Sequence, residues 1–200
     1  MAHDKDYKKE WFEKSQLDYF SPFLTLWLAC NSWYNFQYAL KSDREHIDKL
    51  KADDSKQNKL YAEFNRIFQG GLCKEQTSLF SNLHLLHYSL SRAELKPSKL
   101  EKQLNFSSVL VNFNSKDYSD LIVKNPKTAK GKLKNTVNGV DLGEIVISND
   151  TPTVFAGILE IIYQVRCMLV HGELQPTEEN HEVVKYCYLI LYDLMCGFCS

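Results

Sequence analysis

Hydrophobic residues recur at steps of three and four in five stretches of the chain, within residues 17–40, 60–68, 79–90, 154–170 and 178–195. This spacing matches the period of an α-helix, so the pattern predicts a mainly α-helical fold. In the first stretch the apolar residues occupy nearly every side of the helix. We therefore expect that helix to be covered on every side.

Other segments have a different pattern. Between residues 106 and 150 short alternating runs with β-branched residues predict strands near 109–113 and 140–147, paired with each other as an excursion from the bundle. Residues 42–59 alternate acids and bases, which indicates a solvated loop or an exposed helix without a functional role. Residues 4–14 are expected to form a short docking helix. We therefore predict one domain, residues 1–200, with an insertion at about 106–150.

Composition narrows the function classes. The chain has 200 residues, is 44% hydrophobic and has a net charge of −1, which suits one domain with a real core and argues against a protein that coats nucleic acid through overall charge. No leader pattern and no run of eighteen apolar residues is present, so a cytoplasmic protein without a membrane span is expected. Six cysteines without framework spacing predict reduced thiols rather than a disulfide scaffold.

The late stretch 161–173 combines an apolar helix with one arginine, Arg166, and one histidine, His171. Gly172 is expected to end this helix in a left-handed conformation, which places His171 at the C-terminal end of the helix. The two residues are five positions apart, so one straight helix separates them by roughly 140° around its axis and roughly 7.5 Å along it. A second helix, such as one from a second copy of the chain, would help to close a site between them.

The run Tyr-Gln-Val-Arg166-Cys-Met-Leu-Val-His171-Gly resembles the Arg-x4-6-His signature of the HEPN superfamily. The earlier run Phe-Leu-Thr-Leu-Trp-Leu-Ala-Cys-Asn31-Ser-Trp-Tyr, residues 23–34, resembles the first core helix of a prokaryotic HEPN subgroup. The resemblance implies an α-helical HEPN-like bundle that forms a homodimer and acts as a metal-independent endoribonuclease. It also implies a toxin or phage-defence setting, with an antitoxin or regulatory protein as a further partner. Many relatives carry a polar residue after the arginine, where this chain has Cys167 and Met168.

The implied chemistry uses the RNA itself, because the 2'-hydroxyl attacks the adjacent phosphorus and leaves a 2',3'-cyclic phosphate. His171 would move the proton, since an imidazole titrates near neutral pH, and Arg166 would clamp the phosphate with its forked charge. No cluster of carboxylates at ligand spacing accompanies this helix, so no metal or cofactor is expected.

Two other interpretations of the pair remain open. One is a non-catalytic HEPN module that binds RNA, a nucleotide or a partner protein. The other is a structural helical subunit, in which Arg166 pairs with Glu160, Glu173 or Glu182 and His171 meets the helix dipole.

The remaining candidates each have two interpretations. Asn31 either satisfies a neighbouring backbone carbonyl or orients Arg166 or His171, as the resemblance implies. Lys127, Lys130 and Lys132, with Lys124 and Lys134, form either a solvated mobile loop or a flap that grips RNA phosphates near the site.

Two pairs of possible metal or redox residues complete the set. His84 and His87 share a helix face, either as a metal pair without supporting ligands or as ordinary packing residues. Cys196 and Cys199 form a lone CxxC without the context of a zinc or redox site.

Overall fold

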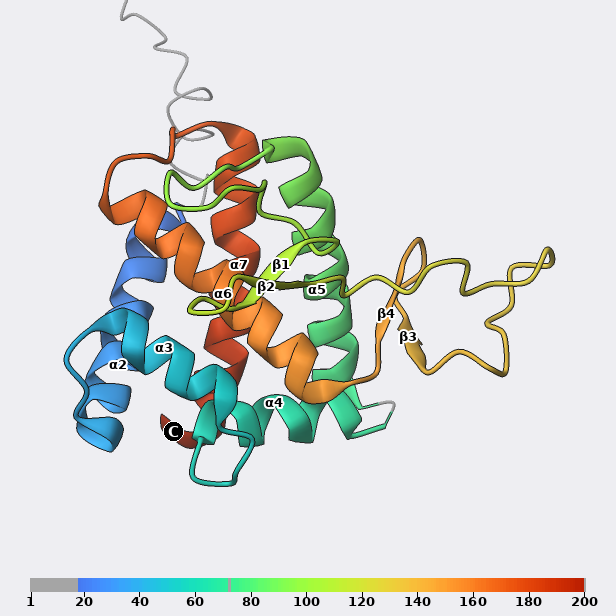
Figure 1. The fold of residues 1–200 in the computed structure, drawn as a ribbon, viewed down its shortest axis with the longest axis horizontal. Coiled ribbons are helices and arrows are strands. Elements are labelled where there is room, and N and C mark those ends of the chain that lie inside the picture. The colour runs from blue at the N-terminus through green and yellow to red at the C-terminus, as the bar shows by residue number, and fades with distance from the viewer. Residues whose placement is uncertain (1–17, 72, 200) are drawn as a thin grey trace, which may run out of the picture.

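Six α-helices make up most of the part of the chain that this computed structural model describes, residues 18–71 and 73–199 (Figure 1). The predicted mainly α-helical class is confirmed. The expected helix at 4–14 lies outside the described residues. The helices are α2 (Phe20–Tyr38), α3 (Asp43–Ala52), α4 (Lys59–Gln69), α5 (Lys74–Ala93), α6 (Thr151–Val170) and α7 (Glu178–Cys199). The strands are β1 (Val109–Asn112), β2 (Asp117–Ser119), β3 (Gly139–Asp141) and β4 (Val146–Ser148).

Helix α6 is the central element of the bundle. It contacts α2, α3, α4, α7 and β1, and Figure 1 shows it crossing the bundle with α3 and the β1–β2 hairpin beside it. Among the described helices it alone is long and apolar enough to cross a membrane by length and composition, and 72% of that window is buried inside the protein. Its apolar character is thus used to form the core.

The last turn of α6 ends as the sequence predicts. Gly172 has a φ of +71°, the left-handed conformation that favours glycine. The N–H of Glu173 donates to the carbonyl of Met168 at 2.8 Å, and the N–H of Gly172 donates to that of Leu169 at 3.3 Å. This is the Schellman arrangement, which satisfies the last carbonyls of the helix and fixes the position of His171 at its end.

Helix α7 closes the bundle against α5, α2 and α4. The N–H of Asn180 donates to the hydroxyl of Thr177 at 3.3 Å, so Thr177 caps the N-terminus of this helix. Buried side chains recur along the helix at steps of three and four, at Val183, Val184, Cys187, Ile190, Leu191 and Leu194. The cysteines of the described residues form no disulfide bond.

Helix α2 buries only one of its faces. Phe23, Trp27 and Tyr34 point into the core, while Phe36 is 91% exposed and Leu28 is 67% exposed. The expectation that this helix is covered on every side is therefore wrong for the single chain. No described segment covers Leu28 and Phe36 on its outer face.

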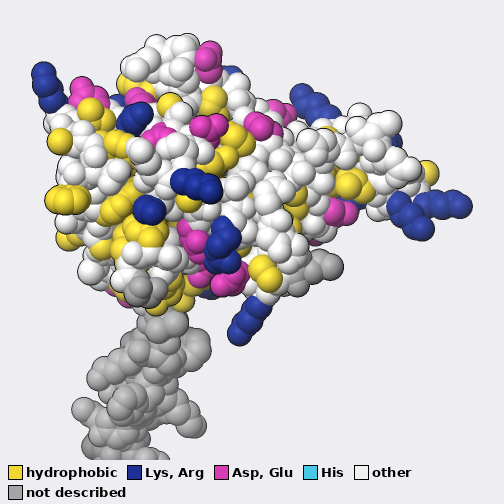
Figure 2. All heavy atoms as spheres, turned by 90° about the horizontal axis from the view of Figure 1, so that it is seen from below, with side chains coloured by type: hydrophobic (Ala, Val, Ile, Leu, Met, Phe, Trp, Pro, Cys, Tyr) yellow, Lys and Arg dark blue, Asp and Glu magenta, His cyan; other side chains and the backbone are white. Residues whose placement is uncertain are grey.

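The insertion at 106–150 is not one paired excursion. Strands β1 and β2 form one antiparallel hairpin and β3 and β4 form another, so the predicted pairing of 109–113 with 140–147 is wrong. The first hairpin belongs to the core, because Val109 and Leu121 pack against Gly157 of α6, where a Cβ atom would lie only 2.9 Å from a Leu121 methyl. The segment between β2 and β3 instead projects from the body as an arm, with Lys or Arg side chains at its far end (Figure 2).

The charged segment 42–59 contains a half-buried helix. Ser42 caps α3 by accepting a hydrogen bond from the N–H of Glu45 at 3.3 Å, and Ile47 and Leu50 are fully buried. The expectation of a wholly solvated segment is wrong, because its charged side chains include ones that face α6.

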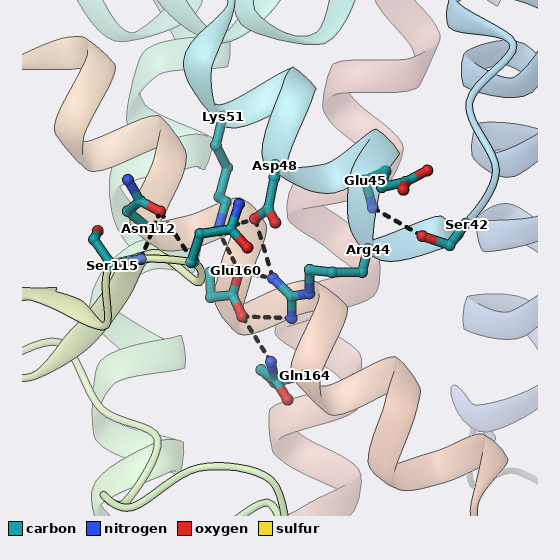
Figure 3. A network of polar contacts seen from close by, with 10 residues as sticks. Ser42, Arg44, Glu45, Asp48, Lys51, Asn112, Ser115, Glu160 and Gln164 are labelled. Atoms are coloured by element: carbon teal, nitrogen blue, oxygen red, sulfur yellow. Dashed lines mark hydrogen bonds and ion pairs between the residues drawn. The ribbon is translucent and has the colours of Figure 1, made fainter.

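Glu160 of α6 is fully buried and receives these charges (Figure 3). Arg44 of α3 donates to both carboxylate oxygens at 2.8 and 3.0 Å, and Lys51 donates at 2.7 Å. Burial alone would raise the pKa of Glu160, but the hydrogen bonds and charges of Arg44 and Lys51 outweigh it, so the pKa lies below its ordinary value. This network fastens α3 to α6.

Substitution of Glu160 by glutamine should destabilise the fold strongly. The change keeps the shape but leaves Arg44 and Lys51, two largely buried cations, with Asp48 as their one remaining counter-charge among the described residues. We therefore expect a loss of about 3 kcal/mol in the free energy of unfolding at neutral pH. Urea denaturation measures this loss. The matched control Glu144→Gln, on the exposed β3–β4 turn, should change the value by no more than about 0.5 kcal/mol.

The loss in the free energy of unfolding caused by Glu160→Gln should also depend on pH. Because the pKa of Glu160 is lowered in the folded state, its stabilisation is present above the ordinary value of 4.5 and is lost as the pH falls through the lower folded-state value. The difference in the free energy of unfolding between wild type and Glu160→Gln should therefore become smaller below about pH 4.5. A difference that stays constant down to acid unfolding would contradict this account.

Candidate functional site

Arg166 lies one turn before the end of α6, and its side chain is 19% exposed. Its Nη2 atom lies 3.1 Å from Oδ2 of Asp43, and its guanidinium faces the Trp27 ring at 5.7 Å from the centroid. Glu160, Glu173 and Glu182, the partners considered in the structural interpretation, are engaged elsewhere, with Arg44 and Lys51, with Ser98 and with Lys185. Asp43 is thus the partner that holds Arg166.

Asn31 of α2 binds the same carboxylate as Arg166. Its amide nitrogen donates to Oδ1 of Asp43 at 2.9 Å and to the Tyr34 hydroxyl at 2.8 Å, and that hydroxyl also donates to Oδ1 at 3.1 Å. Burial and the nearby charge of Asp43 raise the pKa of Tyr34, which keeps its proton available for this bond. Asn31 therefore bonds side chains rather than a backbone carbonyl, and it shares the Asp43 carboxylate with Arg166.

The position of Asp43 follows from the turn between α2 and α3. Asp43 is the first residue of α3, where the helix dipole favours a carboxylate. The buried ring of His46 clamps the turn, because its Nε2 accepts from the N–H of Leu40 at 3.1 Å and its Nδ1 lies 2.9 Å from the Ser42 carbonyl. These bonds assign the proton of His46 to Nδ1, and the ring stabilises the turn between α2 and α3.

His171 is exposed and lines a pocket of about 190 Å³. The pocket is bordered by α3, α6, the segment 97–99 and Phe113, and Arg44 and Lys99 are among its lining residues. Across its rim the hydroxyl and N–H of Ser98 donate to the Glu173 carboxylate at 2.7 and 3.1 Å. These bonds hold the pKa of Glu173 below its ordinary value, and the charge of His171 adds to the effect.

Arg166 and His171 occupy adjoining but different surroundings. Asp43 and Arg44 are consecutive residues of α3, and the first pairs with Arg166 while the second lines the pocket with His171. Arg166 is not among the lining residues of that pocket. The Nε atom of Arg166 is buried and has no hydrogen-bond partner among the described residues.

The lysines of the arm lie away from His171. The arm leads through β4 into the first turn of α6, whereas His171 follows the last turn of this helix of 20 residues, about 30 Å long. Lys127 pairs with Asp141 of β3 at 2.9 Å, and Lys130 and Lys132 are exposed. Within one chain the structure therefore does not bring these three lysines to the Arg166 and His171 region.

The histidine pair of α5 has local partners. His84 lies 3.9 Å from Glu144, and His87 packs against the Phe106 ring, where burial lowers its pKa. Across the described residues no group of three or more His, Cys, Asp and Glu side chains is placed to hold a metal ion.

Sequence reasoning missed Asp43, Arg44 and Lys51, because their segment was interpreted as solvated. One signal was present in the sequence: Ser42 and Glu45 have the spacing of a capping box, and Ile47 and Leu50 follow at helical spacing. Together they mark a helix with a buried face. Nothing local to the segment identified Arg166 as the partner of Asp43.

A double-mutant cycle tests the convergence on Asp43. Because Asn31 and Arg166 bind the two oxygens of one carboxylate, Asn31→Ala and Arg166→Met should show a coupling energy of about 0.5–3 kcal/mol in the free energy of unfolding. In the control pair, Asn31→Ala and Arg92→Ala, the changes in the free energy of unfolding should be additive, because Arg92 pairs with Glu179 instead. Additivity in both pairs would show that Asn31 does not act on Arg166.

Comparison of the chain with protein-family models, with curated proteins and with solved structures found no match. The assignment of roles to Arg166, His171 and Asn31 therefore rests on the geometry above and on the resemblance of two sequence segments.

Proposed function

We propose that this protein is a metal-independent endoribonuclease of the HEPN type, in which a homodimer cleaves RNA through attack of the 2'-hydroxyl on the adjacent phosphorus. One observation carries the proposal. Asn31 and Arg166, each drawn from a different motif-like segment, converge on the same carboxylate, that of Asp43. An exposed His171 follows on the next turn of α6.

Arg166 would bind the scissile phosphate. A guanidinium presents five donors in a planar fork that matches phosphate oxygens, and the Arg166 side chain is 19% exposed. Its place between Asp43 and the Trp27 ring fixes the direction of the fork before substrate binds. Such prior orientation favours the crowded, more negatively charged transition state over the ground state.

His171 would transfer the proton of the 2'-hydroxyl or of the leaving 5'-oxygen. An imidazole suits both tasks near neutral pH. Its position at the end of α6, beyond the buried part of the helix, leaves it accessible to a bulky polymer. Lys99 on the same pocket rim adds positive charge beside the RNA backbone.

A second copy of the chain would complete the site. Arg166 faces α2 and α3, while His171 faces the pocket, so the arginine of one protomer and the histidine of its partner are proposed to act on one phosphate. The outer face of α2, with exposed Leu28 and Phe36, offers an apolar surface for the contact. Exposed Val170, directly before His171, extends apolar surface to the site.

The second candidate function is a non-catalytic module that binds RNA or nucleotide. It is favoured by the Arg166–Asp43 ion pair, which neutralises part of the charge that catalysis would need. The toxin or defence setting with an antitoxin or regulatory partner, and the cytoplasmic location, follow only from the resemblance and the sequence.

Cleavage in EDTA separates the two functions. Wild type should cleave labelled RNA and leave DNA intact, and His171→Ala should lower the rate by about 10²- to 10⁴-fold. Arg166→Lys should also lower the cleavage rate by more than about tenfold, because an ammonium cannot form the bidentate contact with a phosphate. His84→Ala and Arg92→Ala serve as matched controls with unchanged rates. Binding of RNA without cleavage by wild type would support the second candidate instead.

Mixing two inactive variants tests the shared site. When Arg166→Ala and His171→Ala protomers exchange, half of the dimers are mixed, and one of their two sites contains both native residues if these come from different protomers. The mixture should then recover roughly a quarter of the wild-type cleavage rate. No recovery, with exchange verified by differently tagged protomers, would place both residues of a site on one chain.

A further inference from the structure

The pocket beside His171 has features that phosphodiester cleavage does not require. Phe113, Tyr163 and Met168 supply apolar walls, and the exposed His171 and Lys99 place two basic side chains at its rim. Its volume of about 190 Å³ lies below the roughly 300–1,000 Å³ of pockets for drug-sized ligands. A group no larger than a single ring system therefore suits it.

The polar wall of the pocket is fixed in place. Gln164 is only 4% exposed, and its amide nitrogen donates to Glu160 at 2.6 Å, while its oxygen points away from Glu160 (Figure 3). The Arg44 guanidinium lies 4.4 Å from the centroids of both the Phe113 and Tyr163 rings and is held by Glu160. The pocket lining thus combines two aromatic rings that each contact the Arg44 guanidinium, the amide of Gln164 and that fixed planar cation.

These features match the chemistry of a nucleobase. A base needs apolar or aromatic surface for its faces and hydrogen-bonding groups for its edge, and the phosphate attached to it needs positive charge nearby. The Gln164 amide can accept from a ring N–H or an exocyclic amine, and exposed Lys99 and His171 are available to a phosphate at the pocket, where the Glu173 carboxylate is engaged by Ser98. An aliphatic ligand would leave the Gln164 oxygen without a partner.

We propose that this pocket binds one unstacked nucleobase of a phosphate-bearing ligand. The inference rests on the proposed function only in naming RNA as the source of that base, since a free nucleotide carries the same chemistry. With RNA bound, the pocket would select the base next to the scissile phosphate and so give the enzyme a sequence preference.

The experiment measures binding with probes that cannot be cleaved. Short 2'-O-methyl oligonucleotides of A, G, C and U lack the attacking hydroxyl, and a matched strand with an abasic nucleotide lacks one base. Fluorescence anisotropy gives the affinity of wild type, of Cys167→Trp, which fills the pocket, and of Phe113→Ala, which removes an aromatic wall. Leu85→Trp, on the exposed side of α5, is the control. Thermal unfolding verifies that each variant is folded.

Both pocket variants should bind the preferred strand roughly five- to a hundredfold more weakly than wild type and the control, the range expected for the loss of base stacking. Wild type should bind the abasic strand as weakly as the variants bind the full strand. Equal affinities for full and abasic strands, unchanged affinities of both variants, or no binding of any probe by wild type would overturn the proposal.

Two further arms separate this inference from the proposed function. Free AMP, GMP, CMP and UMP binding as tightly as the strands would identify a free nucleotide as the source of the base, whereas binding of strands alone would identify RNA. Base-dependent binding without any RNA cleavage would refute the nuclease and leave the pocket in place. Cleavage combined with base-independent binding would refute the pocket alone.

Discussion

The pairing of buried Glu160 with Arg44 and Lys51 fixes the position of α3, the helix that contributes Asp43 and Arg44 to the candidate site. A carboxylate within the central helix is tolerated only when its charge is compensated, and α3 supplies both cations. Helix α3 must therefore lie along α6 in one register. Two helices held only by apolar packing could slide or rotate against each other. Arg44 hydrogen-bonds to both oxygens of Glu160, so a shift of α3 along α6 would leave buried charges unpaired.

This register determines what the first turn of α3 presents to α6. Asp43 meets Arg166 and the polar side chains of α2, while the neighbouring Arg44 enters the wall of the pocket that His171 lines. A structural network and a candidate site thus share consecutive residues. The proposed phosphate clamp and the proposed base pocket would both lose their geometry if α3 moved, so stability and function are expected to be coupled through this helix.

The sequence predicted those features that depend on local spacing. Helical periodicity located α2, α4, α5 and α7, which each bury part of their surface, and α6, which is buried on all sides from Val154 to Val165. Gly172 predicted the end of α6 because its conformation is local. Strand pairing was predicted wrongly, because alternation marks a strand without naming its partner. Arg166, His171 and Asn31 were singled out through the resemblance, but Asp43, which links two of them, was not. Its role arises from a contact between distant segments, and the high charge of α3 concealed the cations that Glu160 binds.

The central claim is that Arg166 and His171 act on RNA through its own 2'-hydroxyl. Mass spectrometry of the ends produced when the purified protein cuts RNA in EDTA tests this claim most directly. The account predicts a 2',3'-cyclic phosphate on one fragment and a 5'-hydroxyl on the other. Fragments that carry a 5'-phosphate and a 3'-hydroxyl would require water or another external nucleophile and would contradict it.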